Sequence, residues 1–297
     1  MKGLAMHKAA RGLADDAAVL DWPLGLQLVA THDMLAEGVH FTPDCPPVDI
    51  GWKLVAVNLS DLAAMGARPV GVLMGAGIGA GRDAEWASEL VRGMAQALGS
   101  FHAPLLGGDT IRTNAGSVLS LTALGSVPAG SALSRGAAAD GDDLWVSGTI
   151  GDAGLGLEIA LNGSGDATLL KRYRRPTPRL ALGMALRGLA SAAMDVSDGL
   201  LIDAARLADA SGLAADLNSH AIPLSEAAAA AGREVAELAA MGDDYELMFA
   251  APAANRDAIR SAASTAKTPV SRIGTLGNGA GLTLDGSVPA RLGYQHR

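Results

Sequence analysis

The chain has few of the residues that define several common protein classes. Its 297 residues include one cysteine, Cys45, which excludes a disulfide framework within the chain and a cysteine-based zinc site. No apolar run reaches the roughly 18 residues of a membrane span, and residues 1–20 lack the continuous apolar stretch of a signal peptide. We therefore expect a soluble protein of the reducing cytoplasm, with no membrane partner.

Basic and aromatic residues are also scarce. Lys and Arg number 23 against 31 Asp and Glu, and the resulting net charge of −8 argues against a nucleic-acid partner. Aromatic residues make up 3% of the chain, whereas hydrophobic residues make up 49%. A sizeable core must therefore be built from Ala, Leu, Val and Met, in a chain long enough for two domains.

Short apolar runs alternate with longer helical stretches, a pattern typical of α/β or α+β folds. The runs predict strands at 26–31, 70–75, 118–127, 144–147, 193–196, 245–251, 270–274 and 282–284. The helical pattern predicts helices at 49–65 (with Asp49 as N-cap), 84–102 and 199–210, and a further helix that begins at Pro178. The Ala/Gly-rich stretch 135–141 indicates a domain boundary near residue 137.

Several familiar catalytic and nucleotide-binding motifs are absent. The sequence has no Gly-Lys dipeptide and hence no Walker-type P-loop, and it has neither a His-Glu-x-x-His zinc motif nor a nucleophile elbow. The glycine cluster Gly75–Gly81 lacks the spacing of a dinucleotide fingerprint, so we expect a strand-to-helix loop there. We likewise expect a turn at Gly107–Asp109.

The remaining candidates for chemistry are aspartates, most of them beside predicted turns. They are Asp15, Asp16, Asp33, Asp61, Asp109, Asp195, Asp198, Asp243 and Asp244. Each one alone could be a helix cap or a turn residue. Two such charges 4 Å apart repel by roughly 4 kcal/mol at an effective dielectric constant near 20. If the carboxylates converge, they need cations, and oxygen ligands without His or Cys favour Mg²⁺ bound together with phosphate.

Three other features have a plainer interpretation. The basic run 171–179 is expected to be a solvated loop that leads into a capped helix. Asp140, Asp142 and Asp143 are expected to form a solvated turn. His40, taken alone, is more often structural than functional. Asp61 stands out from the other aspartates, because it lies inside a predicted helix three residues after Asn58, on nearly the same face.

Six motifs follow one another along the chain in a specific order. They are residues 13–19 LADDAAV, 33–41 DMLAEGVHF, 51–69 GWKLVAVNLSDLAAMGARP, 107–112 GGDTIR, 194–200 MDVSDGL and 242–247 GDDYEL. As an ordered set, they make the chain similar to the thiamine-monophosphate kinases, a family of the aminoimidazole ribonucleotide synthetase-like superfamily. The resemblance covers residues 12 to about 250.

The resemblance implies a PurM-like fold of two α/β domains. Residues 1–137 would bind ATP and metal and would pair their strands with those of a second copy in a homodimeric β-barrel, and residues 138–297 would form the C-terminal α/β domain. The implied activity is the ATP-dependent phosphorylation of thiamine monophosphate to thiamine diphosphate. The transfer would be direct and in line, assisted by several Mg²⁺ ions, without a protein nucleophile.

The resemblance also implies roles for individual residues. The metal ligands would be Asp16, Thr31, Asp33, Asp61, Asp109, Asp195 and Asp198. The ATP contacts would be Gly108, Asp109, Arg135 and Ser197. The thiamine-phosphate contacts would be His40, Asp243 and Tyr294.

Three positions depart from the family pattern. Ala14 stands where Gly is usual, His32 replaces a Thr hydroxyl, and Asp243 replaces a Glu that is one methylene longer. The departures leave open a degenerate nucleotide-binding homologue as an alternative. Within the superfamily, hydrogenase-maturation dehydratases use a C-terminal Cys, and selenophosphate synthases need a reactive Cys and a Lys near the N-terminus. Neither feature is evident in this sequence.

Overall fold

The computed structural model describes residues 7–9, 17, 18 and 20–294. The chain divides into two compact units. The first unit comprises Met1–Leu62 and Ala67–Gly130, and the second comprises Ala63–Gly66 and Ser131–Arg297. Each unit contains its own β-sheet with helices packed on it. Among the helices of the described residues, none combines the length and the apolar character needed to cross a bilayer.

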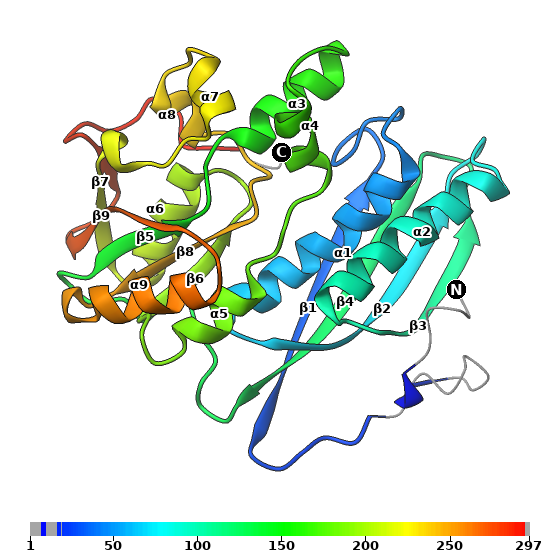
Figure 1. Ribbon diagram of the computed structural model, residues 1–297, viewed down its shortest axis with the longest axis horizontal. Coiled ribbons are helices and arrows are strands. Elements are labelled where there is room, and N and C mark those ends of the chain that lie inside the picture. The colour runs from blue at the N-terminus through cyan, green and yellow to red at the C-terminus, as the bar shows by residue number, and fades with distance from the viewer. Residues whose placement is uncertain (1–6, 10–16, 19, 295–297) are drawn as a thin grey trace. The chain divides into compact units, whose positions relative to one another are not determined.

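The first unit is built on a four-stranded sheet with the strand order β1-β4-β2-β3. Its strands are β1 (Leu26–Ala36), β2 (Arg68–Ile78), β3 (Leu105–Arg112) and β4 (Val118–Pro128). Strands β2 and β3 are parallel, whereas β4 is antiparallel to both β1 and β2. The helices α1 (Pro47–Ala64) and α2 (Ala84–Phe101) lie on one face of this sheet (Figure 1).

The two helices of the first unit approach each other at glycines. A Cβ atom added to Gly93 of α2 would overlap the carbonyl oxygen of Val48, and one added to Gly51 of α1 would overlap that of Leu90. The backbones can therefore meet without intervening side chains. Asp83 caps α2, because its carboxylate accepts a hydrogen bond from the backbone N–H of Trp86 at 2.8 Å.

The predicted strands and helices of the first unit are confirmed, but their boundaries and two connecting segments differ. Strand β1 continues to Ala36, so Asp33 lies within a strand rather than beside a turn. Helix α1 begins at Pro47, so the predicted N-cap Asp49 lies in its first turn.

The loop predicted at Gly75–Gly81 is wrong as far as Ile78, and the turn predicted at Gly107–Asp109 is wrong throughout. In both segments the glycines continue a strand. Strand β2 runs through Gly75 and Gly77 to Ile78, and β3 includes all of Gly107–Asp109. A Cβ atom on Gly75 would lie 2.5 Å from the Ser120 hydroxyl oxygen, and one on Gly108 would overlap the carbonyl oxygen of Met74. These glycines permit close approach between neighbouring strands rather than a reversal of the chain.

The second unit contains a six-stranded sheet with the strand order β10-β7-β9-β5-β8-β6. Its strands are β5 (Asp143–Ser147), β6 (Ala192–Val196), β7 (Leu213–Leu217), β8 (Glu246–Ala251), β9 (Val270–Asn278) and β10 (Leu282–Leu284). Its helices are α3 (Asp152–Asn162), α4 (Ala167–Arg174), α5 (Leu180–Leu186), α6 (Leu200–Ala210), α7 (Glu226–Ala230), α8 (Val235–Ala239) and α9 (Arg256–Thr265). All strand pairs in this sheet are antiparallel except β10 with β7.

The core of the second unit is aliphatic, as the composition predicts. Val146 of β5, Met194 of β6 and Met248 of β8 belong to one buried cluster, together with Leu201 and Leu207 of α6. Helix α6 thereby fixes the position of the segment that leads into it from β6. That segment and the end of β6 carry three of the predicted site residues, Asp195, Ser197 and Asp198.

Most of the predicted elements of the second unit are confirmed, although α5 begins at Leu180 rather than at Pro178. The sequence did not predict β7 or the helices α3, α4, α7, α8 and α9. The predicted solvated turn at Asp140–Asp143 is wrong in its last two residues, which are buried. Asp142 accepts hydrogen bonds from the Ala139 N–H and the Ser191 hydroxyl. Asp143 opens β5 and forms an ion pair with Arg256 at 2.5 Å. Burial of these carboxylates is possible because each has its own donors.

Candidate functional site

The first unit brings together three of the predicted metal ligands. Thr31 and Asp33 alternate along β1 on the face covered by the helices, and Asp61 comes from α1. The Thr31 hydroxyl donates a hydrogen bond to Asp61 Oδ2. Asn58, one helical turn before Asp61, is fully buried, and its Oδ1 accepts from the backbone N–H of Asp33 at 2.8 Å. Strand and helix are thus locked together at this point.

This group of oxygen atoms has the chemistry of a Mg²⁺ site. Burial raises the pKa of Asp33, and the neighbouring His32 opposes that rise in part. A bound cation would favour the charged carboxylate. Mg²⁺ typically takes one or two protein carboxylates and completes its shell with water and phosphate oxygens, so Thr31, Asp33 and Asp61 fit it. Among the described residues, no three His, Cys, Asp or Glu side chains gather into a metal site made by the protein alone.

His40 lies in the tight turn that follows β1. Its Nδ1 accepts a hydrogen bond from the backbone N–H of Ala36 at 3.1 Å, and its own backbone N–H donates to the Ala36 carbonyl at 2.9 Å. The ammonium group of Lys53 donates to the His40 carbonyl at 3.2 Å. Since Nδ1 acts as an acceptor, the neutral ring carries its proton on Nε2. Nε2 is therefore the hydrogen-bond donor of this side chain.

Glu37 fixes the turn that carries His40. One oxygen of its carboxylate accepts from the backbone N–H of Ser117 at 2.9 Å, and the other forms an ion pair with Arg82 at 2.6 Å. Burial alone would raise the pKa of Glu37, but these donors hold it below its usual value. The guanidinium group of Arg82 also lies over the ring of Trp86. The His40 turn is thereby attached to the start of α2.

The first unit does not bring Asp109 close to Asp33 within one chain. Asp109 lies on β3 in register with Gly75, on the outer face of the sheet, whereas Asp33 lies in register with Leu121 on the face covered by the helices. Strands β1 and β3 are the two edges of the sheet, and three strand spacings separate them by about 14 Å. Gly108 precedes Asp109 on the same edge strand.

The second unit gathers five predicted site residues around the turn between β6 and α6. Asp195 is a buried residue of β6, and Ser197 and Asp198 form the turn itself. The backbone N–H of Asp243 donates to the Ser197 carbonyl at 2.8 Å, and that of Tyr294 donates to the Asp198 carbonyl at 2.9 Å. Main-chain bonds therefore join three segments that are far apart in the sequence. We call Val196–Gly199 the β6–α6 turn.

The loop that carries Asp243 has an unusual backbone. Asp243 and Tyr245 both have positive φ angles, 70° and 49°. Few residues other than glycine adopt this region, and Asp is among the more tolerant ones. The backbone N–H of Tyr245 donates to the Val196 carbonyl at 2.8 Å. The bonds to the β6–α6 turn hold the loop in this conformation.

Arg135 lies at the C-terminal end of α6, whereas the β6–α6 turn lies at its N-terminal end. Its carbonyl accepts a hydrogen bond from the hydroxyl group of Ser211, which follows the last residue of that helix. The 11 residues of α6 span about 16 Å, so the backbone of Arg135 is separated by the length of the helix from Ser197. The predicted metal ligand Asp16 lies outside the described residues.

The comparisons with known proteins show the family of the chain. The chain matches the family "AIR synthase related protein, N-terminal domain" over residues 14–127 and the corresponding C-terminal domain over residues 139–287. It is 41% identical to the thiamine-monophosphate kinase of Caulobacter vibrioides over 298 residues, covering 96% of this chain and 84% of that protein. The chain belongs to the thiamine-monophosphate kinase family.

Solved structures of this family share the fold of the chain. A crystal structure of thiamine-monophosphate kinase from Stenotrophomonas maltophilia K279a superposes with a TM-score of 0.85 at 42% identity, over 93% of this chain and 90% of the other. A structure described as AaThiL complexed with AMPPCP and TMP has a TM-score of 0.84 at 28% identity, over 95% and 91% of the two chains. The two-domain, PurM-like α/β prediction is confirmed. Among the described strands, the sheet of the first unit is open rather than closed into a barrel.

Buried ion pairs lie next to the loop that carries Asp243, and the sequence did not predict them. Glu246, at the end of the 242–247 motif of the thiamine-monophosphate kinases, is 0% exposed and forms ion pairs with Arg172 at 2.6 Å and with Arg179. The predicted solvated loop at 171–179 is therefore wrong: Arg172 lies in α4, and both arginines point inward. Burial would raise the pKa of Glu246, but the two arginines hold it below its usual value.

Asp244, between Asp243 and Tyr245, is also buried. Its carboxylate accepts hydrogen bonds from the backbone N–H groups of Gly151 at 2.8 Å and Ala153 at 3.2 Å, at the start of α3. Burial raises its pKa to about 8, although these two donors act in the opposite direction. Asp244 therefore anchors the Asp243 loop to α3 from the inside.

Two further residues near the predicted site, Asp203 and Arg206 of α6, were also missed. Asp203 is completely buried, and burial raises its pKa, while the Asp198 N–H and Arg206 oppose the rise. The available signal in the sequence was an acidic residue in the first turn of α6 followed by Arg three residues later, a spacing at which side chains meet.

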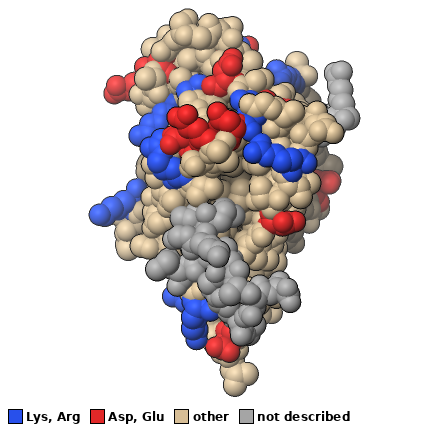
Figure 2. Space-filling model, turned by 90° about the vertical axis from the view of Figure 1, so that its right-hand side faces the viewer, with Lys and Arg blue, Asp and Glu red and all other residues tan. Residues whose placement is uncertain are grey.

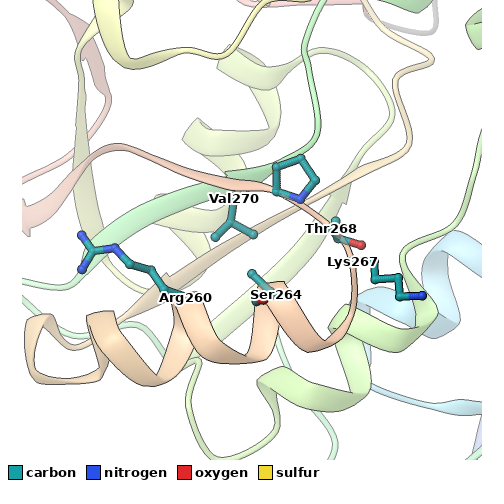
Figure 3. Close-up of a pocket in the computed structure, with 7 residues that line it drawn as sticks. Arg260, Ser264, Lys267, Thr268 and Val270 are labelled. Atoms are coloured by element: carbon teal, nitrogen blue, oxygen red, sulfur yellow. The ribbon is translucent and has the colours of Figure 1, made fainter.

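The second unit also contains a pocket of about 320 Å³. It is formed by the end of α9 and the start of β9, and Figure 3 shows Arg260 and Lys267 at its two sides. The lining residues are Arg260, Ala263, Ser264, Lys267, Thr268, Pro269 and Val270. None of them belongs to the predicted site.

The charged side chains on one face of the molecule are mixed in sign. In Figure 2, Lys and Arg side chains lie next to Asp and Glu side chains on that face. A nucleic-acid backbone is bound by an extended basic surface, and the coloured residues of this face do not form one.

Proposed function

We propose that this chain transfers the γ-phosphate of ATP to thiamine monophosphate and thereby forms thiamine diphosphate. The observation that carries the proposal is the main-chain connection in the second unit. It joins Ser197, one of the four predicted ATP contacts, to Asp243 and Tyr294, two of the three predicted thiamine-phosphate contacts, at one turn. The family relationship supports the same reaction, because a structure of a family member is described as a complex with AMPPCP and TMP.

The reaction requires positioning rather than a protein nucleophile. An oxygen of the thiamine phosphate attacks the γ-phosphorus of ATP, and the bond between that phosphorus and the β,γ-bridging oxygen breaks. Donor and acceptor are both anions. Mg²⁺, when bound, neutralises part of their charge. Thr31, Asp33 and Asp61 would hold it in the first unit, and Asp195 and Asp198 in the second.

The remaining roles follow the family pattern. Asp16 and Asp109 would be further metal ligands. Because Asp109 lies on the opposite face and the opposite edge of the sheet from Asp33, it would bind a different ion from the one at Asp33. Gly108, Asp109, Arg135 and Ser197 would contact ATP. In the substrate site, His40 would donate from Nε2 to an oxygen of the thiamine phosphate, with Asp243 and Tyr294 on the same substrate.

We further propose that the protein works as a homodimer in the cytoplasm. The outer face of the four-stranded sheet exposes large apolar side chains, including Leu28 at 53%, Met34 at 51% and Ile111 at 60%. An exposed apolar patch of this kind is typical of an interaction surface. A second copy that pairs through this face would bury the patch, in line with the barrel implied by the family resemblance.

The activity is tested with the purified protein, ATP, Mg²⁺ and thiamine monophosphate. We expect thiamine diphosphate to form, and we expect its formation to stop when EDTA removes the metal. Parallel reactions with thiamine, and with ATP alone, measure phosphorylation of other acceptors and hydrolysis. ATP binding without any thiamine diphosphate would instead support the degenerate nucleotide-binding homologue.

A further inference from the structure

The β6–α6 turn is held from the inside by one carboxylate. Asp203, on the first turn of α6, is 0% exposed. Its Oδ2 accepts hydrogen bonds from the backbone N–H groups of both Ser197 and Asp198, each at 3.0 Å. These two donors are therefore already used within the protein. The group that Ser197 can direct at a nucleotide is its hydroxyl.

Arg206 connects the same carboxylate to the predicted metal ligand. Its Nη1 donates to Asp203 Oδ1 at 2.8 Å and to Asp198 Oδ2 at 2.5 Å. The three side chains differ in exposure: Asp203 is fully buried, Asp198 is 21% exposed, and Arg206 is 41% exposed. One guanidinium nitrogen thus bridges a buried structural carboxylate and a carboxylate that reaches the surface.

We propose that Asp203 and Arg206 are positioning residues that set how strongly Asp198 binds a divalent cation. The proposal rests on the proposed function, in which Asp198 is a metal ligand. Asp203 fixes the turn and holds Arg206 in place. Arg206 acts as a resident counter-cation on Asp198 Oδ2, so a metal ion bound by Asp198 must share or take over that oxygen.

Arg206 is positively charged and Asp203 is negatively charged. Replacing them by neutral residues should therefore change cation binding by Asp198 in opposite directions. Replacing Arg206 by Gln removes a positive charge beside Asp198 and leaves a more attractive carboxylate for a cation. Replacing Asp203 by Asn keeps an oxygen that can accept from the turn, but it removes the negative charge that shares Arg206. Arg206 then pairs with Asp198 alone, and cation binding weakens. A purely structural role would make both variants worse in the same direction.

The test measures Mn²⁺ binding by the full-length protein with a non-hydrolysable ATP analogue, in the absence of turnover. Free Mn²⁺ is followed by electron paramagnetic resonance. We expect Arg206→Gln to lower the Mn²⁺ dissociation constant about two- to fivefold, and Asp203→Asn to raise it by a similar factor, the size expected for a partly exposed ion pair. Arg206→Lys, which keeps the charge, should stay close to wild type.

Two controls assign the effect to Asp198. Arg260→Gln removes an arginine with the same spacing from its partner, Asp257, on the exposed surface of α9, and it should leave Mn²⁺ binding unchanged. In an Asp198→Asn background, Arg206→Gln should lose its effect, because the oxygen it affects is no longer charged. Thermal unfolding of each variant separates loss of fold from loss of binding.

The outcomes distinguish this inference from the proposed function. If the wild type forms thiamine diphosphate but Arg206→Gln leaves Mn²⁺ binding unchanged or weaker, the counter-cation role is wrong. That role is also wrong if Arg206→Gln fails to fold and Arg206→Lys and Asp203→Asn bind Mn²⁺ alike. If the wild type binds Mn²⁺ and nucleotide and the variants shift as expected, yet no thiamine diphosphate forms, the proposed reaction fails and the positioning roles stand.

Discussion

At the scale of single residues, His40 offers a test of which ring nitrogen acts on the substrate. Its Nδ1 accepts from the Ala36 N–H, so Nε2 is the donor. In Gln the amide nitrogen can reach the position of Nε2, whereas in Asn it lies near that of Nδ1. We expect His40→Gln to raise KM for thiamine monophosphate less than His40→Asn, which should raise it roughly 10- to 100-fold, the loss expected for a bond to a charged group.

The measurement for His40 is the steady-state KM for both substrates. KM for ATP should stay near the wild-type value in both variants, which serves as the internal control. Equal effects of Gln and Asn on KM for thiamine monophosphate would contradict the assignment of the donor to Nε2.

Asp61, near the C-terminal end of α1, offers a test of the metal-ligand role. We expect Asp61→Asn to reduce kcat by about 100-fold or more, because the charge that would hold the cation is lost. The fold should persist, since the amide oxygen of Asn can still accept the Thr31 hydroxyl bond. The check is kcat together with the melting temperature. Near-normal kcat would remove Asp61 from the metal ligands.

Functional residues could be predicted from the sequence only where the residue type and its motif indicate a chemical role. Asp33 and Asp61 were indicated by the sequence itself and Thr31 by the family resemblance, and the three lie together in the structure. Asp203 and Arg206 were not, because their importance depends on backbone N–H groups of a turn whose shape no local pattern reveals. A buried carboxylate at a helix start looks the same in sequence as an ordinary acidic residue of a first helical turn.

At the scale of elements, the packing of α1 against α2 depends on a glycine in each helix. Gly93→Ala should cost several kcal/mol of unfolding free energy, because the new methyl group would overlap the carbonyl oxygen of Val48 and force the helices apart. Gly99 lies in the same helix with no neighbour within 4 Å of an added Cβ atom. Gly99→Ala should therefore be neutral or stabilising by up to about 1 kcal/mol.

The comparison is made by urea unfolding of the two alanine variants and the wild type. Both substitutions raise helix propensity equally, so the difference between them isolates the helix contact. If Gly93→Ala were as stable as Gly99→Ala, the close approach of the two helices would be wrong.

The elements that the sequence predicted well are those in which the local pattern of apolar and polar residues determines the structure. The strands at 193–196 and 282–284 and the helix at 84–102 match the structure to within a residue. The predictions for the glycine-rich segments were wrong because glycine favours a turn locally, whereas contacts with the neighbouring strand determine the structure. Gly75 and Gly108 are strand residues because Ser120 and Met74 lie against them, which is long-range information.

At the scale of the whole molecule, the exposed face of the four-stranded sheet predicts the oligomeric state. We expect the wild type to sediment as a dimer. Met34→Lys should shift it toward the monomer, because it adds a charge to an apolar surface that the second copy would cover. Leu161→Lys changes an apolar residue of the second unit that is even more exposed, 67% against 51% for Met34, and is the matched control. Analytical ultracentrifugation at several concentrations gives the result, and a monomeric wild type would contradict the proposal.

The buried acid Asp244 predicts how stability depends on pH. Its pKa is about 8 in the folded protein against an ordinary value of 3.8. Between these values the folded state holds a proton that the unfolded state has released, so the free energy of unfolding falls as pH rises. The fall due to this one group is about 1.4 kcal/mol per pH unit, and it ends above pH 8, where both states are ionised. Below pH 3.8 both states are protonated, and the contribution is constant.

Asp244→Asn removes this titration while leaving an oxygen that can accept from the Gly151 N–H. Relative to the wild type, the variant should therefore gain stability as pH is raised from about 5 to 8, as measured by urea unfolding at each pH. Asp285→Asn is the control of opposite kind. Its carboxylate is bonded to the Ser219 N–H and has a lowered pKa, so its contribution changes only in the acid range. Parallel pH profiles for the wild type and Asp244→Asn over this range would mean that Asp244 is ionised in the folded protein, and the Asp243 loop would then rest on a buried charge compensated by Arg172.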